Sequence, residues 1–313
     1  MTGTRYLPDY RCLRRHFMSV WLCLLAPLAL ADDTLELITR LDHPALTEVS
    51  GMTASGWPDV FWLHNDSGDE ARLFAIDSQG DVLMPGYLAS RYQNEPWPGL
   101  QILNAWNVDW EDITRAPDGT VFVTDLGNNG NSRRDLGIYV LNEPNPLAIA
   151  QSRALSFLPV RYPDQLQFPA KLWHFDCEAV FHADGTLYFL TKHRKPGEIV
   201  GWETGSKLYR LDTRFNDQDN VLTEVSQSPE LALATAADLS ADQTHLAVLT
   251  YLGVWLYRKP AEGDDWLSGQ SRYISLPREQ LKTSEAMTWS SENTLLIANE
   301  EGDLLRLTLD SLP

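Results

Sequence analysis

Short apolar segments separated by polar turns recur along the chain at a nearly constant spacing. Each segment has a small or acidic pair, an apolar residue, a polar turn and an apolar run of strand length. The five segments begin at Ser50, Glu111, Glu178, Ala237 and Glu285. Their apolar anchors lie 61, 67, 59 and 48 residues apart, at Met52, Ile113, Val180, Leu239 and Met287. This spacing indicates one supersecondary unit that is used five times.

Further apolar strands complete each unit. A third strand is expected in the runs "RLFAID", "GIYVL", "KLYRLD", "VWLYR" and "LLRLTL", and four units add a fourth. Asp118-Gly119 and Asp184-Gly185 lie where a tight hairpin needs positive φ. The pattern predicts an all-β fold, a single β-propeller of five four-stranded blades. The length also allows six blades, but a sixth start motif is not found.

Two irregular stretches bear on how the ring is built. The last unit ends at Pro313 after three strands, and residues 34–41 have strand composition. We therefore expect this N-terminal strand to become the outer strand of the last blade, which closes the ring and removes an open edge. In the first unit, residues 81–88 are expected to form the fourth strand and residues 91–108 a loop over one face.

The first 31 residues have the pattern of an export signal. Arg11, Arg14 and Arg15 precede an apolar run that ends in Ala29-Leu30-Ala31, a small-x-small cleavage pattern. The run is shorter than the roughly 20 residues that span a bilayer. We expect a signal peptide over 1–31, a propeller domain over 32–313, a periplasmic or secreted location, and no membrane span after processing.

The charge of the mature chain narrows the choice of partners. Without residues 1–31 it carries 21 basic and 42 acidic side chains, a net charge of −21. Such a surface repels phosphate backbones and anionic headgroups, which argues against nucleic acid and membrane surfaces. A small-molecule or protein ligand, or a cation, is a better match. An acidic surface without a specific partner is the plain alternative.

The blade starts place carboxylates at equivalent positions. The first strand of a blade lines the central channel, so Ser50, Glu111, Glu178, Ala237 and Glu285 are expected to form a ring, followed by a second ring one residue later. Crowded carboxylates repel one another unless their pKa values rise or a cation binds. Calcium, which takes oxygen ligands, is the preferred cation. The candidate metal ligands are Glu111, Asp112, Glu178, Asp238 and Glu285.

Two other roles for these carboxylates stay open. They could accept hydrogen bonds from backbone N–H groups at strand ends, or they could be catalytic acids and bases.

The ends of the second strands supply a further set of polar residues. His64 beside Asp66 could act as an acid–base pair, and with Lys192 these are the candidate catalytic residues. The candidate ligand-binding residues are Asn65, Asp125, Asn128, His193, Tyr251, Asn299 and Glu300. The runs "HNDSGD" and "DLGNNGN" are also compatible with ordinary Asx turns.

Several motifs together resemble a known family. They are "HNDSGD" (64–69), "DWEDI" (109–113), "TDLGNN" (124–129), "FDCEAV" (175–180), "AADLSAD" (236–242) and "EAMTW" (285–289). In this order they resemble a widespread family of secreted bacterial β-propeller proteins, most of which lack an assigned activity. More distantly, the layout is similar to phytase-like and gluconolactonase-type propellers, a resemblance that implies calcium and hydrolytic chemistry in the central channel. No catalytic residue of those enzymes matches a position here.

Two functions follow as hypotheses. The first is an exported propeller with an acidic central funnel, a ligand- or protein-binding module loaded with calcium. The alternative is a metal-assisted hydrolase of phosphoester, lactone or ester substrates. The residues do not decide whether the protein is an enzyme.

Overall fold

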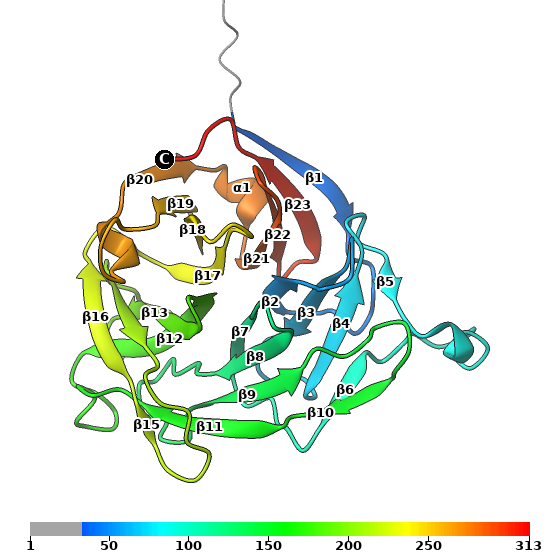
Figure 1. Ribbon diagram of the computed structural model, residues 1–313, viewed down its shortest axis with the longest axis horizontal. Helices are drawn as coiled ribbons and strands as arrows, with labels where there is room; N and C mark the ends of the chain where they lie inside the picture. Colours follow the sequence, from blue (N-terminus) through cyan, green and yellow to red (C-terminus); the bar gives the residue numbers. More distant parts are fainter. Residues whose placement is uncertain (1–32) are drawn as a thin grey trace, which may run out of the picture. The chain divides into compact units, whose positions relative to one another are not determined.

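The computed structural model describes residues 33–313, and five sheets in this part of the chain are arranged as a ring (Figure 1). The predicted signal peptide lies outside the described residues. The all-β, five-bladed propeller is confirmed. The short helical segments are η1 (Gly86–Leu88), η2 (Trp266–Ser268) and α1 (Arg278–Leu281). None of the described helices is long and apolar enough to cross a membrane.

Each blade contributes its first strand to the inside of the ring. The innermost strands are β2 (Val49–Ala54), β7 (Trp110–Arg115), β12 (Trp173–Ala183), β17 (Ala234–Leu239) and β21 (Ser284–Ser291). Each contacts the innermost strands of the two adjacent blades, and the contact between β21 and β2 closes the circle. The second strands are β3 (Phe61–Asn65), β8 (Thr120–Asp125), β13 (Thr186–Arg194), β18 (His245–Thr250) and β22 (Thr294–Asn299). The third strands are β4 (Arg72–Ile76), β9 (Gly137–Asn142), β14 (Ser206–Arg210), β19 (Gly253–Arg258) and β23 (Asp303–Thr308).

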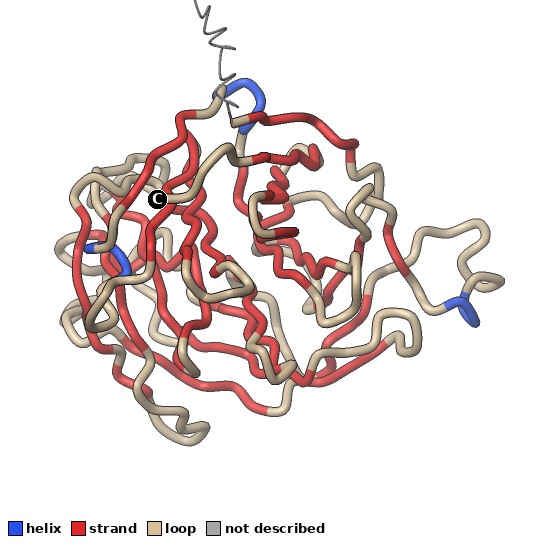
Figure 2. The backbone as a smooth tube through the Cα atoms, turned by 45° about the horizontal axis from the view of Figure 1, so that its top comes forward, coloured by secondary structure: helices blue, strands red, loops and turns tan. Residues whose placement is uncertain are grey.

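The N-terminal strand closes the ring as expected. Strand β1 (Thr34–Arg40) pairs antiparallel with β23, with Thr34 opposite Thr308. The last blade therefore combines the first described strand with the last three strands of the chain. Figure 2 shows the sheets tilted, with loops joining their strands and the segment around η1 projecting outward from the ring.

The outer strands differ from expectation in the first blade. The predicted strand over 81–88 shrinks to β5 (Val82–Leu83), because Pro85 cannot donate to a ladder and η1 follows it. Instead β6 (Leu100–Leu103), from the stretch predicted to be a loop, pairs antiparallel with β4. The remaining outer strands are β10 (Gln151–Arg153), β11 (Ser156–Arg161), β15 (Asn220–Val221), β16 (Thr223–Ser228) and β20 (Ser271–Ser275).

Two outer strands join neighbouring blades. Strand β10 pairs in parallel with β6, and β15 pairs in parallel with β11. Apolar side chains fill the space between blades: Trp62 and Trp110 pack together between the first two. Each fully buried large apolar side chain stabilises the fold by about 1.5–3 kcal/mol. Interblade packing of this kind holds the inner strands, and hence the centre of the ring, in place.

A buried carboxylate ties three blades together at the ring's inner wall. Asp112 is fully buried, and its Oδ2 accepts hydrogen bonds from the backbone N of Val180 at 2.8 Å and of Ala237 at 3.2 Å. Its Oδ1 accepts one from the N of Ile113 at 2.8 Å. The three donors belong to β12, β17 and β7. Asp112, a candidate metal ligand, therefore takes the backbone-satisfying role that the sequence left open.

We expect Asp112→Ala to lower the free energy of unfolding by about 3 kcal/mol or more, because it leaves three buried N–H groups without an acceptor. Urea unfolding followed by circular dichroism measures this. The matched control is Asp217→Ala, at an exposed position, which should stay within about 0.5 kcal/mol of the wild type. Equal stability of the two variants would contradict the role given to Asp112.

Candidate functional site

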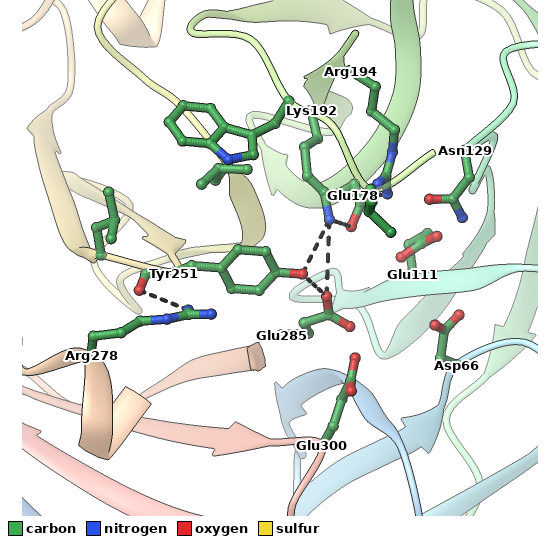
Figure 3. Close-up of a pocket in the computed structure, with 14 residues that line it drawn as sticks. Asp66, Glu111, Asn129, Glu178, Lys192, Arg194, Tyr251, Arg278, Glu285 and Glu300 are labelled. Atoms are coloured by element: carbon green, nitrogen blue, oxygen red, sulfur yellow. Dashed lines mark hydrogen bonds and ion pairs between the residues drawn. The ribbon is translucent and has the colours of Figure 1, made fainter. Parts of the chain in front are cut away.

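A cavity of about 500 Å³ opens at the centre of the ring, and all five blades line it (Figure 3). The innermost strands contribute Glu111, Glu178 and Glu285. The second strands and the turns after them contribute Asp66, Lys192, Tyr251 and Glu300. Seven of the residues singled out from the sequence are thus brought together. Three of them were candidate metal ligands and four were candidate catalytic or ligand-binding residues.

A repeated β-bulge aims the inner side chains at this cavity. The pairing of the first two strands shifts register between Trp110 and Ile113, between Cys177 and Ala179, and between Ser284 and Ala286. Each shift falls at one of the three glutamates. A bulged residue leaves the ladder, and its side chain is re-aimed. Because the same bulge recurs in these three blades, the glutamates at the bulged positions all point into one cavity.

The bulge also corrects the alignment of the fourth unit. There the register shifts between Ala234 and Ala236, so Thr235, not Ala237, is equivalent to the bulged glutamates. The expected ring therefore holds at Ser50, Glu111, Glu178 and Glu285, with Thr235 in place of Ala237. Asp238 lies three residues beyond the bulge and lines a different cavity. There it accepts hydrogen bonds from Trp289 N at 2.9 Å and Thr288 Oγ1 at 2.7 Å, a structural role like that of Asp112.

One part of the cavity wall carries its own counter-charges. Lys192 Nζ lies 2.7 Å from Glu178 Oε2 and 3.9 Å from Glu285 Oε1. It also donates to Tyr251 Oη at 3.4 Å, and the Tyr251 hydroxyl donates to Glu285 (Figure 3). Burial acts to lower the pKa of Lys192, but the charges of Glu178, Tyr251 and Glu285 together outweigh it and the pKa lies well above its usual value. This lysine is a fixed cation in the wall.

Arg194 extends the ion-paired region. Its guanidinium pairs with Asp176 and donates from Nη2 to Glu178 Oε1 at 2.9 Å. Carboxylate oxygens of Glu111, Asp176 and Glu178 lie within 4.8 Å of one another, a spacing that suits a metal ion. Arg194 and Lys192 together supply two positive charges to Asp176 and Glu178, so these two acids are neutralised without a metal.

An adjoining group of carboxylates shares Glu111 with the first but has no ion pair in the described structure. Oxygens of Asp66, Asp109 and Glu111 also lie within 4.8 Å of one another. Glu111 is 3% exposed, and among the described residues no donor reaches its carboxylate or that of Asp109. The carboxylate of Asp66 accepts only the backbone N–H of Ser67, at 2.5 Å, among the described residues. In Figure 3 no interaction line reaches Asp66 or Glu111, although both face the cavity.

Asp66, Asp109 and Glu111, called the carboxylate triad below, have no counter-charge, and their pKa values are raised as a result. Burial, followed by the charges of Glu178 and Asp66, raises the pKa of Glu111 well above its usual value. Burial also raises the pKa of Asp66 to about 7 and that of Asp109 to about 6. These carboxylates are ionised near neutral pH only at a cost in free energy. A bound cation removes that cost, and three carboxylates are the ligands that hard cations prefer.

A glycine keeps space open beside the triad. A Cβ atom at Gly127 would lie 2.1 Å from Glu111 Oε1 and 2.5 Å from Asp109 Oδ2. Asp125 accepts from the N of Asp109 at 3.1 Å and pairs with Arg133 at 2.9 Å, which fixes the chain at Asp109. Asp125, predicted to bind ligand, therefore acts behind the triad rather than in the cavity lining.

His64 does not line the cavity. It is fully buried, its ring meets Trp110 edge-on at 5.5 Å, and its Nδ1 contacts the carbonyl O of Asn65 at 3.0 Å. Burial lowers its pKa to about 4. No hydrogen bond joins it to Asp66 in the described structure, so the predicted acid–base pair is not assembled. The physical reason is strand alternation, because His64 lies in β3 and points into the interblade core.

The other predicted ligand-binding residues hold loops or pack against neighbours. Asn65 donates to Ala45 O and Asp69, both at 2.7 Å. Asn128 receives two backbone N–H groups of its own loop on Oδ1. Asn299 accepts from the N of Asp303 at 2.8 Å. Asn128 and Asn299 thus make Asx-type contacts within their loops, as the alternative interpretation held for Asn128, whereas Asn65 ties its loop to Ala45. His193 stacks on His174 at 3.7 Å, away from the cavity lining.

Several site residues were not singled out as candidates from the sequence. Asp109 belongs with Glu111 and Asp112 to one acidic run that the sequence already suggests as cation-binding, and Asp176 precedes Glu178 by the same two positions, an offset that could have identified it. The others that line the cavity are Asn129, Arg194, Val200, Trp202, Leu233, Leu252 and Arg278. Arg194 ends β13, Arg278 begins α1 and the others come from loops, so they share no position in the repeat and the repeat gave no signal for them.

No protein-family model and no curated protein matches the chain. Among solved structures, the chain is similar to the PQQ-bound aldose sugar dehydrogenase of Streptomyces coelicolor, with TM-score 0.50, 9% identity, and coverage of 89% of this chain and 98% of that one. A gluconolactonase of Xanthomonas campestris gives TM-score 0.46 and 14% identity over 90% of this chain and 91% of that one. The soluble aldose sugar dehydrogenase of Escherichia coli gives 0.45 and 9% over 88% and 99%. At these identities the similarity concerns the fold alone.

The raised pKa of Asp66 predicts how the stability of the metal-free protein changes with pH. An acid whose pKa is higher folded than unfolded stabilises the fold at low pH, and this contribution is lost as pH rises through about 7. In chelator, the wild type should therefore lose stability relative to Asp66→Asn between about pH 4 and pH 8. Urea unfolding across this range measures the difference, with the exposed Asp217→Asn as control. A difference that stays constant or grows with pH would refute the assignment.

Proposed function

We propose that this protein is an exported ligand-binding module whose central cavity holds a calcium ion at Asp66, Asp109 and Glu111. The observation that carries the proposal is Glu111, a carboxylate that is 3% exposed, faces the cavity and receives no hydrogen bond from the described residues. Burial of an unpaired carboxylate is costly, and a cation is the direct remedy.

The donor set favours calcium over other cations. All three groups are carboxylates, and in the described part of the chain neither His64, His193 nor Cys177 lines the cavity, so soft and borderline metals find no ligand of their kind. Calcium accepts six to eight oxygens in flexible geometry and leaves positions for water or ligand. The two acids from loops and one from a bulge suit that flexibility better than the strict octahedron of magnesium.

The cavity supports a small-molecule ligand rather than a protein one. Its volume, about 500 Å³, lies in the range of small-molecule sites, and polar groups converge on it from all five blades. The acidic charge of the chain disfavours nucleic acid. Export to the periplasm or medium, where calcium is available, is proposed from residues 1–31 and is part of the same hypothesis.

A second candidate function uses the same cavity. Burial and the adjacent Glu285 raise the pKa of Glu300 to about 8, so this group can give or take a proton near neutral pH. A metal-assisted hydrolase of phosphoester, lactone or ester substrates would employ Glu300 in that role. The binding function ranks first because Lys192 and Arg194 are already held by carboxylates.

Calcium should stabilise the wild type and not Glu111→Gln. At a free concentration one hundred times the dissociation constant, binding adds about 2.7 kcal/mol to the free energy of unfolding, which raises the melting temperature by several degrees. Calorimetric melting with calcium and with chelator measures this, and isothermal titration gives the stoichiometry. Gly127→Ala should also lose binding, since its methyl group enters the space beside Glu111.

Asp217→Asn is the matched control and should bind calcium as the wild type does. The metal site would be refuted if calcium did not change the melting temperature of the wild type, or if it raised that of Glu111→Gln by the same amount.

If the hydrolase function holds, calcium-loaded protein should hydrolyse p-nitrophenyl phosphate, p-nitrophenyl acetate or δ-gluconolactone, and Glu300→Gln should reduce kcat by about 100-fold or more. Wild-type turnover no greater than that of Glu300→Gln on all three substrates would leave binding as the function.

A further inference from the structure

The rim of the cavity carries apolar side chains that nothing in the described structure covers. Val200 is 93% exposed, Trp202 44% and Leu252 47%, and all three line the cavity. Val200 and Trp202 come from the connection between β13 and β14, and Leu252 from the turn between β18 and β19. Leu233, which is buried, lies in the same wall. Two separate segments thus present one apolar rim, defined here as Val200, Trp202 and Leu252.

The polar and apolar parts of the cavity are segregated. In Figure 3, Tyr251 and Arg278 lie on one side, and Asp66, Glu111 and Asn129 lie on the other. Arg278 covers the ring of Tyr251 at 5.1 Å from its centroid. The apolar rim belongs to the blades and connections that carry Tyr251 and Lys192, whereas the carboxylate triad lies across the cavity. A ligand that contacts both must have two chemically different ends.

Charge excludes an anionic end. Seven carboxylates lie in or directly behind the wall, at Asp66, Asp109, Glu111, Asp176, Glu178, Glu285 and Glu300, against the cations Lys192, Arg194 and Arg278. A bound divalent cation reduces the formal charge from −4 to −2. A carboxylate or phosphate would add negative charge to a site that still has an excess.

Hydrogen-bonding capacity then selects among uncharged groups. Lys192 and Arg194 already donate to Glu178, so the main donors of the wall are occupied. With the cation bound, the carboxylates of Asp66, Asp109 and Glu111 are ionised and only accept hydrogen bonds, so a ligand beside them must donate. Hydroxyl groups donate and can also coordinate calcium through oxygen, whereas ester and lactone groups only accept.

From this arrangement we infer that the cavity binds an amphiphilic, uncharged molecule with a hydroxyl-rich head group and an aliphatic tail. The head group lies at the carboxylate triad and its cation, and the tail lies along the apolar rim. Two of the three rim side chains, Val200 and Leu252, are aliphatic and favour hydrocarbon, and the indole of Trp202 adds apolar area beside them. This inference rests on the proposed binding function and adds the ligand class to it.

Alkyl glucosides provide a matched series of probes. In titration calorimetry on protein first shown to bind calcium, hexyl β-D-glucopyranoside should bind about tenfold more tightly than methyl β-D-glucopyranoside, since part of the alkyl chain leaves water. The double variant Val200→Ser/Leu252→Ser should lose most of this difference while methyl glucoside affinity stays unchanged. The control Leu155→Ser replaces a leucine that is 59% exposed but does not line the cavity.

Each other outcome overturns the inference. Equal affinity for the methyl and hexyl glucosides would show that the rim does not bind an alkyl tail. Tighter binding of hexanoate than of the glucosides would show that the head group need not be uncharged. Absence of glucoside binding at millimolar concentration, with calcium binding intact, would refute the ligand class while the metal site stands. Co-sedimentation with phosphatidylcholine vesicles that the double variant abolishes would assign the rim to a membrane surface instead.

Discussion

The structure of the cavity depends on a buried carboxylate that has no counter-charge. Glu111 faces the centre of the ring, removed from water, and two further acids approach it within metal-ligand range. An isolated ion in such a place is unstable. The neighbouring wall solves the same problem with Lys192 and Arg194, which pair with Glu178. One group of acids in the cavity is paired with Lys192 and Arg194 and forms an ion-pair network. The other group has no such partner and is therefore the candidate cation site.

The architecture creates this arrangement by repetition. A bulge near the start of each inner strand turns one side chain toward the axis, and where that residue is glutamate the acids converge. Interblade packing and the ring-closing strand hold the backbone rigid, while loops such as the one containing Gly127 add groups behind the wall. Function then varies through loop residues on a fixed scaffold, as the rim residues Val200 and Trp202 illustrate.

The sequence predicted the fold well because strand periodicity repeats five times, and even the closing strand followed from the short last unit. The site was predicted only in part. Glu111, Glu178 and Glu285 converge because their units align without error, whereas the bulge of the fourth unit falls at Thr235 and no acid of that unit reaches the cavity. Asp112 and His64 could not be placed from the sequence, since whether a side chain points to the axis or to the core depends on the bulge.

The central claim is that the triad, and not the ion-paired group, holds a metal ion. An anomalous difference map from crystals grown with calcium and then exchanged with manganese locates the metal directly. The account predicts one peak, between the carboxylates of Asp66, Asp109 and Glu111. A peak between Asp176 and Glu178, or no peak at the triad in calcium-saturated crystals, would contradict it.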